Sequence, residues 1–97
     1  MNKEKYYVYI ITNTENNSTV TGVTNNLEKI QNSLHSVYKS EQHSNNAKLV
    51  YYEYFSDIKE ALLREQEINR RTSHKRNSII SWFNPEWEDL VRDFRKN

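Results

Sequence analysis

The chain has 97 residues, a formal net charge of +1 and no cysteine. This length allows one domain with one modest core, and we expect residues 1–97 to form it. The lack of cysteine excludes a disulfide framework and a cysteine-ligated zinc site. The longest apolar run is six residues and the N-terminus lacks a signal-peptide pattern, so we expect a soluble, cytoplasmic protein without a membrane partner.

Two short strands joined by a polar loop are predicted near the N-terminus. Residues 6–11 are aromatic or β-branched without a break, which is typical of a strand buried on both faces. Residues 12–18 form a turn-prone loop, and residues 19–23 return as the second strand of an antiparallel hairpin. Gly22, the only glycine, lies in this second strand, where a glycine marks either a bulge or a close approach to the backbone.

A helix and a third strand follow. Asn25 and Asn26 supply turn or N-cap residues before a helix predicted over residues 27–39, whose apolar residues recur at spacings of three and four. Residues 40–46 are polar and are interpreted as a loop. Residues 49–55 are again aromatic and β-branched, which predicts the third strand.

The next helix carries a carboxylate on its apolar stripe. Asp57 is expected to cap it, with Glu60 as capping-box partner. Glu65 lies on the stripe, and burial of a carboxylate is costly unless something pairs with it. Its position therefore indicates a buried ion pair, an edge position or a metal ligand. The inward residues of this stripe are predicted to be Ile58, Ala61, Leu62, Glu65 and Ile68.

The C-terminal part is predicted to be helical with one break. Thr72 or Ser73 begins a helix that Asn84 and Pro85 end, because the residue before proline is disfavoured in helical geometry. Apolar residues between 87 and 94 predict a short closing helix or turn on the core. The order β-β-α-β-α-α predicts a small α+β domain.

Positive charge is concentrated in one segment. Residues 64–76 contain five Lys or Arg residues and two Glu residues, whereas the remainder has nine cations and eleven anions. Local clustering of this kind indicates nucleic-acid binding, and the alternative is an ordinary solvated helix end.

Three blocks of sequence occur in a recognisable order. They are YYVYIITN at 6–13 with VTGVTNNLE at 20–28, KLVYYE at 48–53 with ALLRE at 61–65, and NPEWEDL at 84–90. Together they resemble the GIY-YIG nuclease superfamily, in its small stand-alone branch. The resemblance implies a three-stranded antiparallel sheet flanked by helices, and a phosphodiester-cleaving site with one divalent cation, magnesium or manganese.

The resemblance also assigns site residues. The tyrosine near the attacking water corresponds to Tyr9, the metal-binding glutamate to Glu65, and the glycine of the second triplet to Gly22. Three other polar members of the family site are replaced here. The second tyrosine, the arginine and the histidine correspond to Val20, Ile30 and Leu34.

These replacements predict a degenerate nuclease fold that still binds nucleic acid, most simply DNA. Losing one stabiliser of developing charge costs about a hundred- to a thousand-fold in rate, so hydrolysis is expected to be absent or marginal. The alternatives are an active metal-dependent endonuclease using Tyr9 and Glu65, and a protein-interaction module. The residues expected to contact nucleic acid are Lys29, Arg70, Arg71, His74, Lys75 and Arg76.

Overall fold

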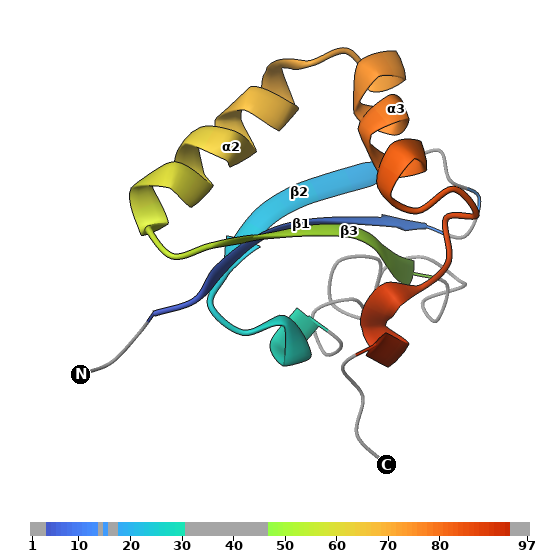
Figure 1. Cartoon of the computed structure of the whole chain (residues 1–97). Helices are drawn as coiled ribbons and strands as arrows, with labels where there is room; N and C mark the ends of the chain where they lie inside the picture. Colours follow the sequence, from blue (N-terminus) through green and yellow to red (C-terminus); the bar gives the residue numbers. More distant parts are fainter. Residues whose placement is uncertain (1–3, 14, 16–17, 31–46, 94–97) are drawn as a thin grey trace.

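The structure is a computed structural model that describes residues 4–13, 15, 18–30 and 47–93. Its elements are β1 (Tyr6–Asn13), β2 (Thr19–Thr24), the 3₁₀ helix η1 (Leu27–Lys29), β3 (Ala47–Phe55), α2 (Ile58–Arg70), α3 (Ser73–Phe83) and the 3₁₀ helix η2 (Leu90–Asp93). The strands form one antiparallel sheet in the order β2-β1-β3. Helices α2 and α3 lie on one face, and η1 and η2 lie on the other (Figure 1). The α+β prediction is confirmed.

Strand β1 is the centre of the sheet, as its unbroken apolar sequence predicts. It pairs with β2 in a continuous register from Tyr7↔Thr24 to Thr12↔Thr19. Its pairing with β3 shifts between Ile10 and Ile11. The irregularity therefore lies on the β3 side, and Gly22 of β2 does not mark a bulge.

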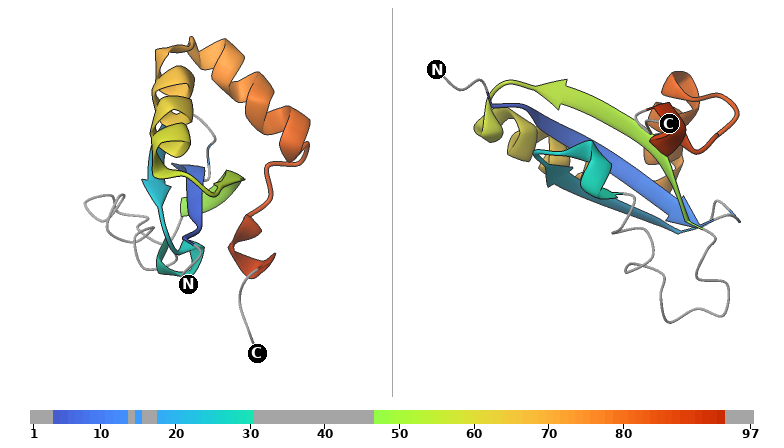
Figure 2. Two further views of the ribbon diagram at one scale, coloured as in Figure 1. Left: turned by 60° about the vertical axis from the view of Figure 1, so that its left-hand side comes forward. Right: turned by 90° about the horizontal axis from the view of Figure 1, so that it is seen from below.

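The sheet separates two apolar clusters because successive strand side chains point to opposite faces. Val8 and Ile10 of β1 pack under α2 and α3 with Ala61, Ile68 and Ile80. Ile11 belongs to the opposite cluster, whose other buried members are Leu27, Ile30, Leu49 and Val91. The two views of Figure 2 show the helices and the 3₁₀ helices on either side of the sheet.

Helix α2 turns a different face to the sheet from the one expected. Ala61 and Ile68 are fully buried, but Ile58 is 37% and Leu62 43% exposed, so the prediction was wrong for these two residues. Ala61 and Ile68 are seven residues apart and nearly aligned along the helix, and the small Ala61 allows a close approach to the sheet. The stripe that results runs through positions 61, 64, 65 and 68.

The ends of α2 and α3 follow local sequence signals. Asp57 is the N-cap of α2, as predicted, and its Oδ1 accepts a hydrogen bond from the Lys59 N–H over 2.9 Å. The donor is therefore the second helical residue, and not Glu60, the predicted capping-box partner. Thr72 caps α3 by accepting from the Lys75 N–H over 3.2 Å. No helix among the described residues is long and apolar enough to cross a membrane.

The segment after α3 is held by one buried side chain. Asn84 Nδ2 donates to the carbonyls of Val50, over 3.1 Å, and Glu88, over 2.8 Å, while Asn84 Oδ1 accepts from the Glu88 N–H over 3.1 Å. Residues 90–93 then form η2, and Val91 belongs to the buried cluster on the face of the sheet opposite α2 and α3. The predicted closing element is confirmed up to residue 93, and Phe94 lies outside the described residues.

Candidate active site

Tyr9 lies across Gly22 on the same face of the sheet. The two residues are direct cross-strand partners, so their Cα atoms are adjacent and their side-chain positions point the same way. A Cβ at position 22 would be 2.4 Å from Tyr9 Oη and 2.6 Å from Cζ. Of the two predicted roles for Gly22, a bulge or a close approach to the backbone, the structure shows the close approach. The absence of a side chain at position 22 makes room for the tyrosine ring.

Helix α2 brings Glu65 toward this tyrosine. Ala61 and Ile68 fix the rotation of the helix, and the stripe between them carries Arg64 and Glu65. Both side chains are partly buried. Arg64 extends to Glu53 of β3, with 3.0 Å between Arg64 Nε and Glu53 Oε1. Glu65 lies close enough to Tyr9 for its charge to act on the phenol.

Two causes raise the pKa of the Tyr9 hydroxyl above its ordinary value of 10.0. Burial of the ring disfavours the phenolate, and the negative charge of Glu65 disfavours it further. Tyr9 is therefore a neutral phenol at physiological pH, able to donate or accept a hydrogen bond. A cation bound to Glu65 would remove the second cause and leave the first.

The donor set around Glu65 fits one divalent ion with a single protein carboxylate. Among the described residues, no three His, Cys, Asp or Glu side chains gather where they could hold a metal. Magnesium is commonly bound by one or two carboxylates, with waters and substrate phosphate oxygens completing the octahedron. Glu65 meets that requirement.

The positions that the resemblance assigns to further polar residues either carry apolar side chains on the face of the sheet that Tyr9 shares, or lie outside the described residues. Ile30 is 2% exposed and packs with Ile11, Leu27, Leu49 and Val91, on the sheet face opposite α2. Val20 is exposed on the edge strand β2. Lys29 is exposed on η1. Leu34 and the rest of the predicted helix over residues 31–39 lie outside the described residues.

Three of the predicted cations, Arg70, Arg71 and Lys75, lie together at the junction of α2 and α3. Arg70, Arg71 and Lys75, with Glu67 and Thr72, line a hollow of about 390 Å³. His74 is exposed beside them. Lys29 is separated from this group because η1 lies on the other face of the sheet (Figure 1).

Arg76 occupies a different environment from its neighbours. It is partly buried, and its Nε atom is covered without a hydrogen-bond partner among the described residues. An unpaired buried donor is costly, and an anion near the guanidinium would satisfy it.

A network on the β3 side was not foreseen from the sequence. Glu53 Oε1 accepts from Tyr51 Oη over 2.8 Å and from Arg64 Nε over 3.0 Å. Arg64 Nη1 donates to Glu67 over 2.9 Å, and Arg71 donates to the other Glu67 oxygen over 3.0 Å. The seven-residue spacing of Ala61 and Ile68 was the signal that could have placed Arg64 inward.

The charges in this network stabilise one another. Burial by itself disfavours the charged form of Arg64, but hydrogen bonds with Tyr51, Glu67 and Glu53 raise its pKa, so the guanidinium stays charged. The pKa of Glu67 is lowered by its hydrogen bonds with Arg64 and Arg71. Burial raises the pKa of Tyr51, which remains a phenol.

The chain is similar to proteins of known fold. Residues 5–78 match the family described as the GIY-YIG catalytic domain. A solution NMR structure of the UPF0213 protein from Bacillus halodurans has a similar fold, with a TM-score of 0.57 and 21% sequence identity, covering 95% of this chain and 99% of that one. No curated protein matches the sequence. Because the family match spans well over half of the 97 residues, the chain belongs to the GIY-YIG family.

Proposed function

We propose that this chain is a GIY-YIG-fold domain that binds nucleic acid, with DNA as the expected form, and hydrolyses phosphodiesters marginally or not at all. Nucleic acid is the general substrate class of this family of nuclease domains. The observation that carries the proposal is the burial of Ile30. It occupies the position that the resemblance assigns to the arginine of the family.

An isoleucine there has no means of steadying a phosphate. Ile30 has no charge, and its side chain packs among other apolar residues. Removing one preorganised group that stabilises developing charge typically costs about a hundred- to a thousand-fold in rate. The neutral phenol of Tyr9 adds to this loss, because a general base must first give up its proton.

The part of the site that persists is Tyr9, Gly22 and Glu65. A divalent cation, magnesium or manganese, would be held by Glu65 and would supply polarisation of a phosphoryl oxygen and a more acidic bound water. The charge of that carboxylate acts on the Tyr9 hydroxyl. Gly22 keeps the space that the ring occupies.

The contacts to nucleic acid would come from the α2–α3 junction. Arg70, Arg71 and Lys75 provide positive charge around a hollow, and Thr72, the N-cap of α3, also lines it. Backbone N–H groups at a helix N-terminus favour anions, so phosphate oxygens suit this place. Arg71 already pairs with Glu67, so the larger share of the attraction falls to Arg70 and Lys75.

The test is the salt dependence of binding. Fluorescence anisotropy with labelled single- and double-stranded DNA and RNA gives the slope of log K against log salt. Replacing Arg70 and Lys75 together with Gln is expected to reduce the magnitude of the slope by about 2, since each phosphate contact contributes about 1. Lys59→Gln is the matched control, because this exposed lysine is at the other end of α2. Binding that is undetectable at low salt, or insensitive to salt, contradicts the proposal.

The retained proximity of Tyr9 and Glu65 favours one second candidate, an active metal-dependent endonuclease. Incubation with plasmid DNA and magnesium or manganese distinguishes the two. Cleavage that Glu65→Gln and Tyr9→Phe both abolish would replace the inactive proposal with the active one. Cleavage that persists equally in both variants comes from a contaminant and leaves the inactive assignment in place.

A further inference from the structure

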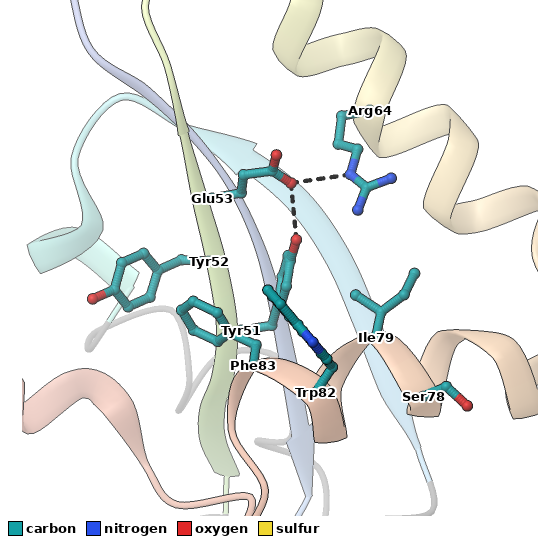
Figure 3. Close-up of a pocket in the computed structure, with 8 residues that line it drawn as sticks. All are labelled: Tyr51, Tyr52, Glu53, Arg64, Ser78, Ile79, Trp82 and Phe83. Carbon is teal, nitrogen blue, oxygen red and sulfur yellow. Dashed lines mark hydrogen bonds and ion pairs between the residues drawn. The ribbon is translucent and has the colours of Figure 1, made fainter.

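A second hollow, of about 500 Å³, lies between β3, which forms one edge of the sheet, and helices α2 and α3 (Figure 3). One side of it is aromatic. The ring of Phe83 meets the rings of Tyr51 and Tyr52 edge-on, with centroids 5.0 Å and 5.4 Å away. Trp82 lies next to them and is 84% exposed. The hollow thus has a packed aromatic wall and one indole with an open face.

The other side of the hollow is charged. Glu53 and Arg64 line it, joined to each other and to the Tyr51 hydroxyl (Figure 3). Both bonds to Glu53 use the same oxygen, Oε1, and Oε2 accepts no hydrogen bond from any described residue. Arg64 offers five N–H groups, and its hydrogen bonds with Glu53, Glu67 and Tyr51 leave others of them for a ligand. An acceptor and donors therefore face the same space as the aromatic wall.

We propose that this hollow receives an unpaired nucleobase, with its face on Trp82 and its polar edge toward Glu53 and Arg64. The inference rests on the proposed nucleic-acid binding. Nucleobases are flat and carry adjacent donors and acceptors on one edge, which is the combination that the two sides of the hollow match. An apolar side chain of a protein partner would cover Glu53 and Arg64 without satisfying them, and interface centres are depleted of such charges.

The location relative to the basic hollow supports the same occupant. Glu67 bonds to Arg64 on one side and to Arg71 on the other, so the aromatic hollow and the α2–α3 junction are neighbours. A strand with a phosphate at Arg70 and Lys75 would then bring a base to Trp82. The base contributes stacking, and the phosphate contributes the salt-dependent attraction.

Comparison of a base-bearing strand with an abasic strand of equal length separates these two contributions. By anisotropy at fixed salt, the wild-type protein is expected to bind the base-bearing single strand about tenfold more tightly than the abasic strand. Trp82→Ala should abolish this preference and leave the affinity for the abasic strand and its salt slope unchanged. Leu63→Ala is the control, because Leu63 is also exposed on a helix but does not line the hollow.

The outcomes distinguish this inference from the proposal beneath it. Salt-dependent binding with the same base preference in Trp82→Ala and wild type overturns the base pocket and leaves the phosphate surface intact. Absence of binding to either strand overturns both. A Trp82→Ala variant that loses self-association in sedimentation velocity, with its base preference unchanged, assigns Trp82 to a protein contact and also overturns the inference. Because Trp82 is exposed, circular dichroism is expected to show an unaltered fold.

Discussion

Replacing Gly22 with alanine tests whether the tyrosine ring requires the glycine. The added Cβ would be 2.4 Å from Tyr9 Oη and 2.6 Å from Cζ, distances at which the ring has to move. The backbone does not require a glycine, since no glycine in the described chain has a positive φ. The expected effect therefore comes from the contact with Tyr9 alone.

The magnitude follows from two opposing effects. Forcing an extra methyl group against a packed ring typically costs about 1–3 kcal/mol. Alanine in the interior of a strand is better than glycine by about 0.5–1 kcal/mol, since the unfolded chain has less freedom to lose. Gly22→Ala is thus expected to lower the free energy of unfolding by up to about 2.5 kcal/mol, and the melting temperature by about 4–8 °C for each kcal/mol.

A double-mutant cycle with Tyr9→Ala makes the prediction specific, because Gly22→Ala should destabilise the protein when the Tyr9 ring is present and stabilise it when the ring is absent. Without the ring, Gly22→Ala should stabilise the protein by about 0.5–1 kcal/mol, which gives an interaction energy of about 1–3 kcal/mol. Urea unfolding followed by circular dichroism measures the free energy of unfolding of each variant, and the values can be compared when the m-values are equal. The same loss of stability in the Tyr9 and Tyr9→Ala backgrounds would refute the role assigned to the glycine.

Three further substitutions test other parts of the structure. Ile30→Arg restores the arginine of the family at a buried position, where its charge has no partner. The free energy of unfolding should fall by about 3–5 kcal/mol. If the variant is as stable in urea as the wild type, position 30 is not part of the core. Glu65→Gln should lower the pKa of Tyr9 while burial keeps it above 10.0, as read from the ultraviolet absorbance of the phenolate. The raised pKa of Tyr9 contributes stability that is present below about pH 10 and is lost as the pH rises through the pKa of the folded state. Glu65→Gln should therefore narrow the pH range over which this stability is lost. An unchanged Tyr9 titration would show that the charge of Glu65 does not act on Tyr9. Asn84→Ala leaves the Val50 carbonyl without its side-chain donor. The free energy of unfolding, measured by thermal unfolding, should fall by about 2–3 kcal/mol. A loss below about 0.5 kcal/mol would mean that Asn84 does not hold the C-terminal segment.

Much of the fold was readable because its signals are local. The aromatic and β-branched runs gave all three strands, and Thr72 and Asn84 gave the ends of α3. Each of these signals acts within a few residues through backbone preference or capping, so tertiary contacts were not needed to find them. The strands nevertheless extend a little beyond their predicted ends, since pairing continues into the flanking polar residues.

The inward face of α2 shows where local reasoning failed. Apolar spacing placed four residues on the inward stripe, Ile58, Ala61, Leu62 and Ile68. Packing against the sheet buried Ala61 and Ile68 and left Ile58 and Leu62 exposed. A helix can satisfy several apolar stripes, and the close approach allowed by a small residue decides among them. That rotation is what turned Arg64 toward Glu53, and it leaves the charge of Glu65 within range of the Tyr9 hydroxyl.

The sequence by itself determined the strands, the helix caps and the membership of the GIY-YIG family, because these depend on residue identity at short spacing. The sequence also placed Ile30 on a core-facing stripe, and it is buried. Only the tertiary structure decided that Gly22 accommodates Tyr9 and that Trp82 is left exposed beside a charged hollow. The reason is physical: burial and contact depend on residues from distant parts of the chain, and the sheet brings those residues together.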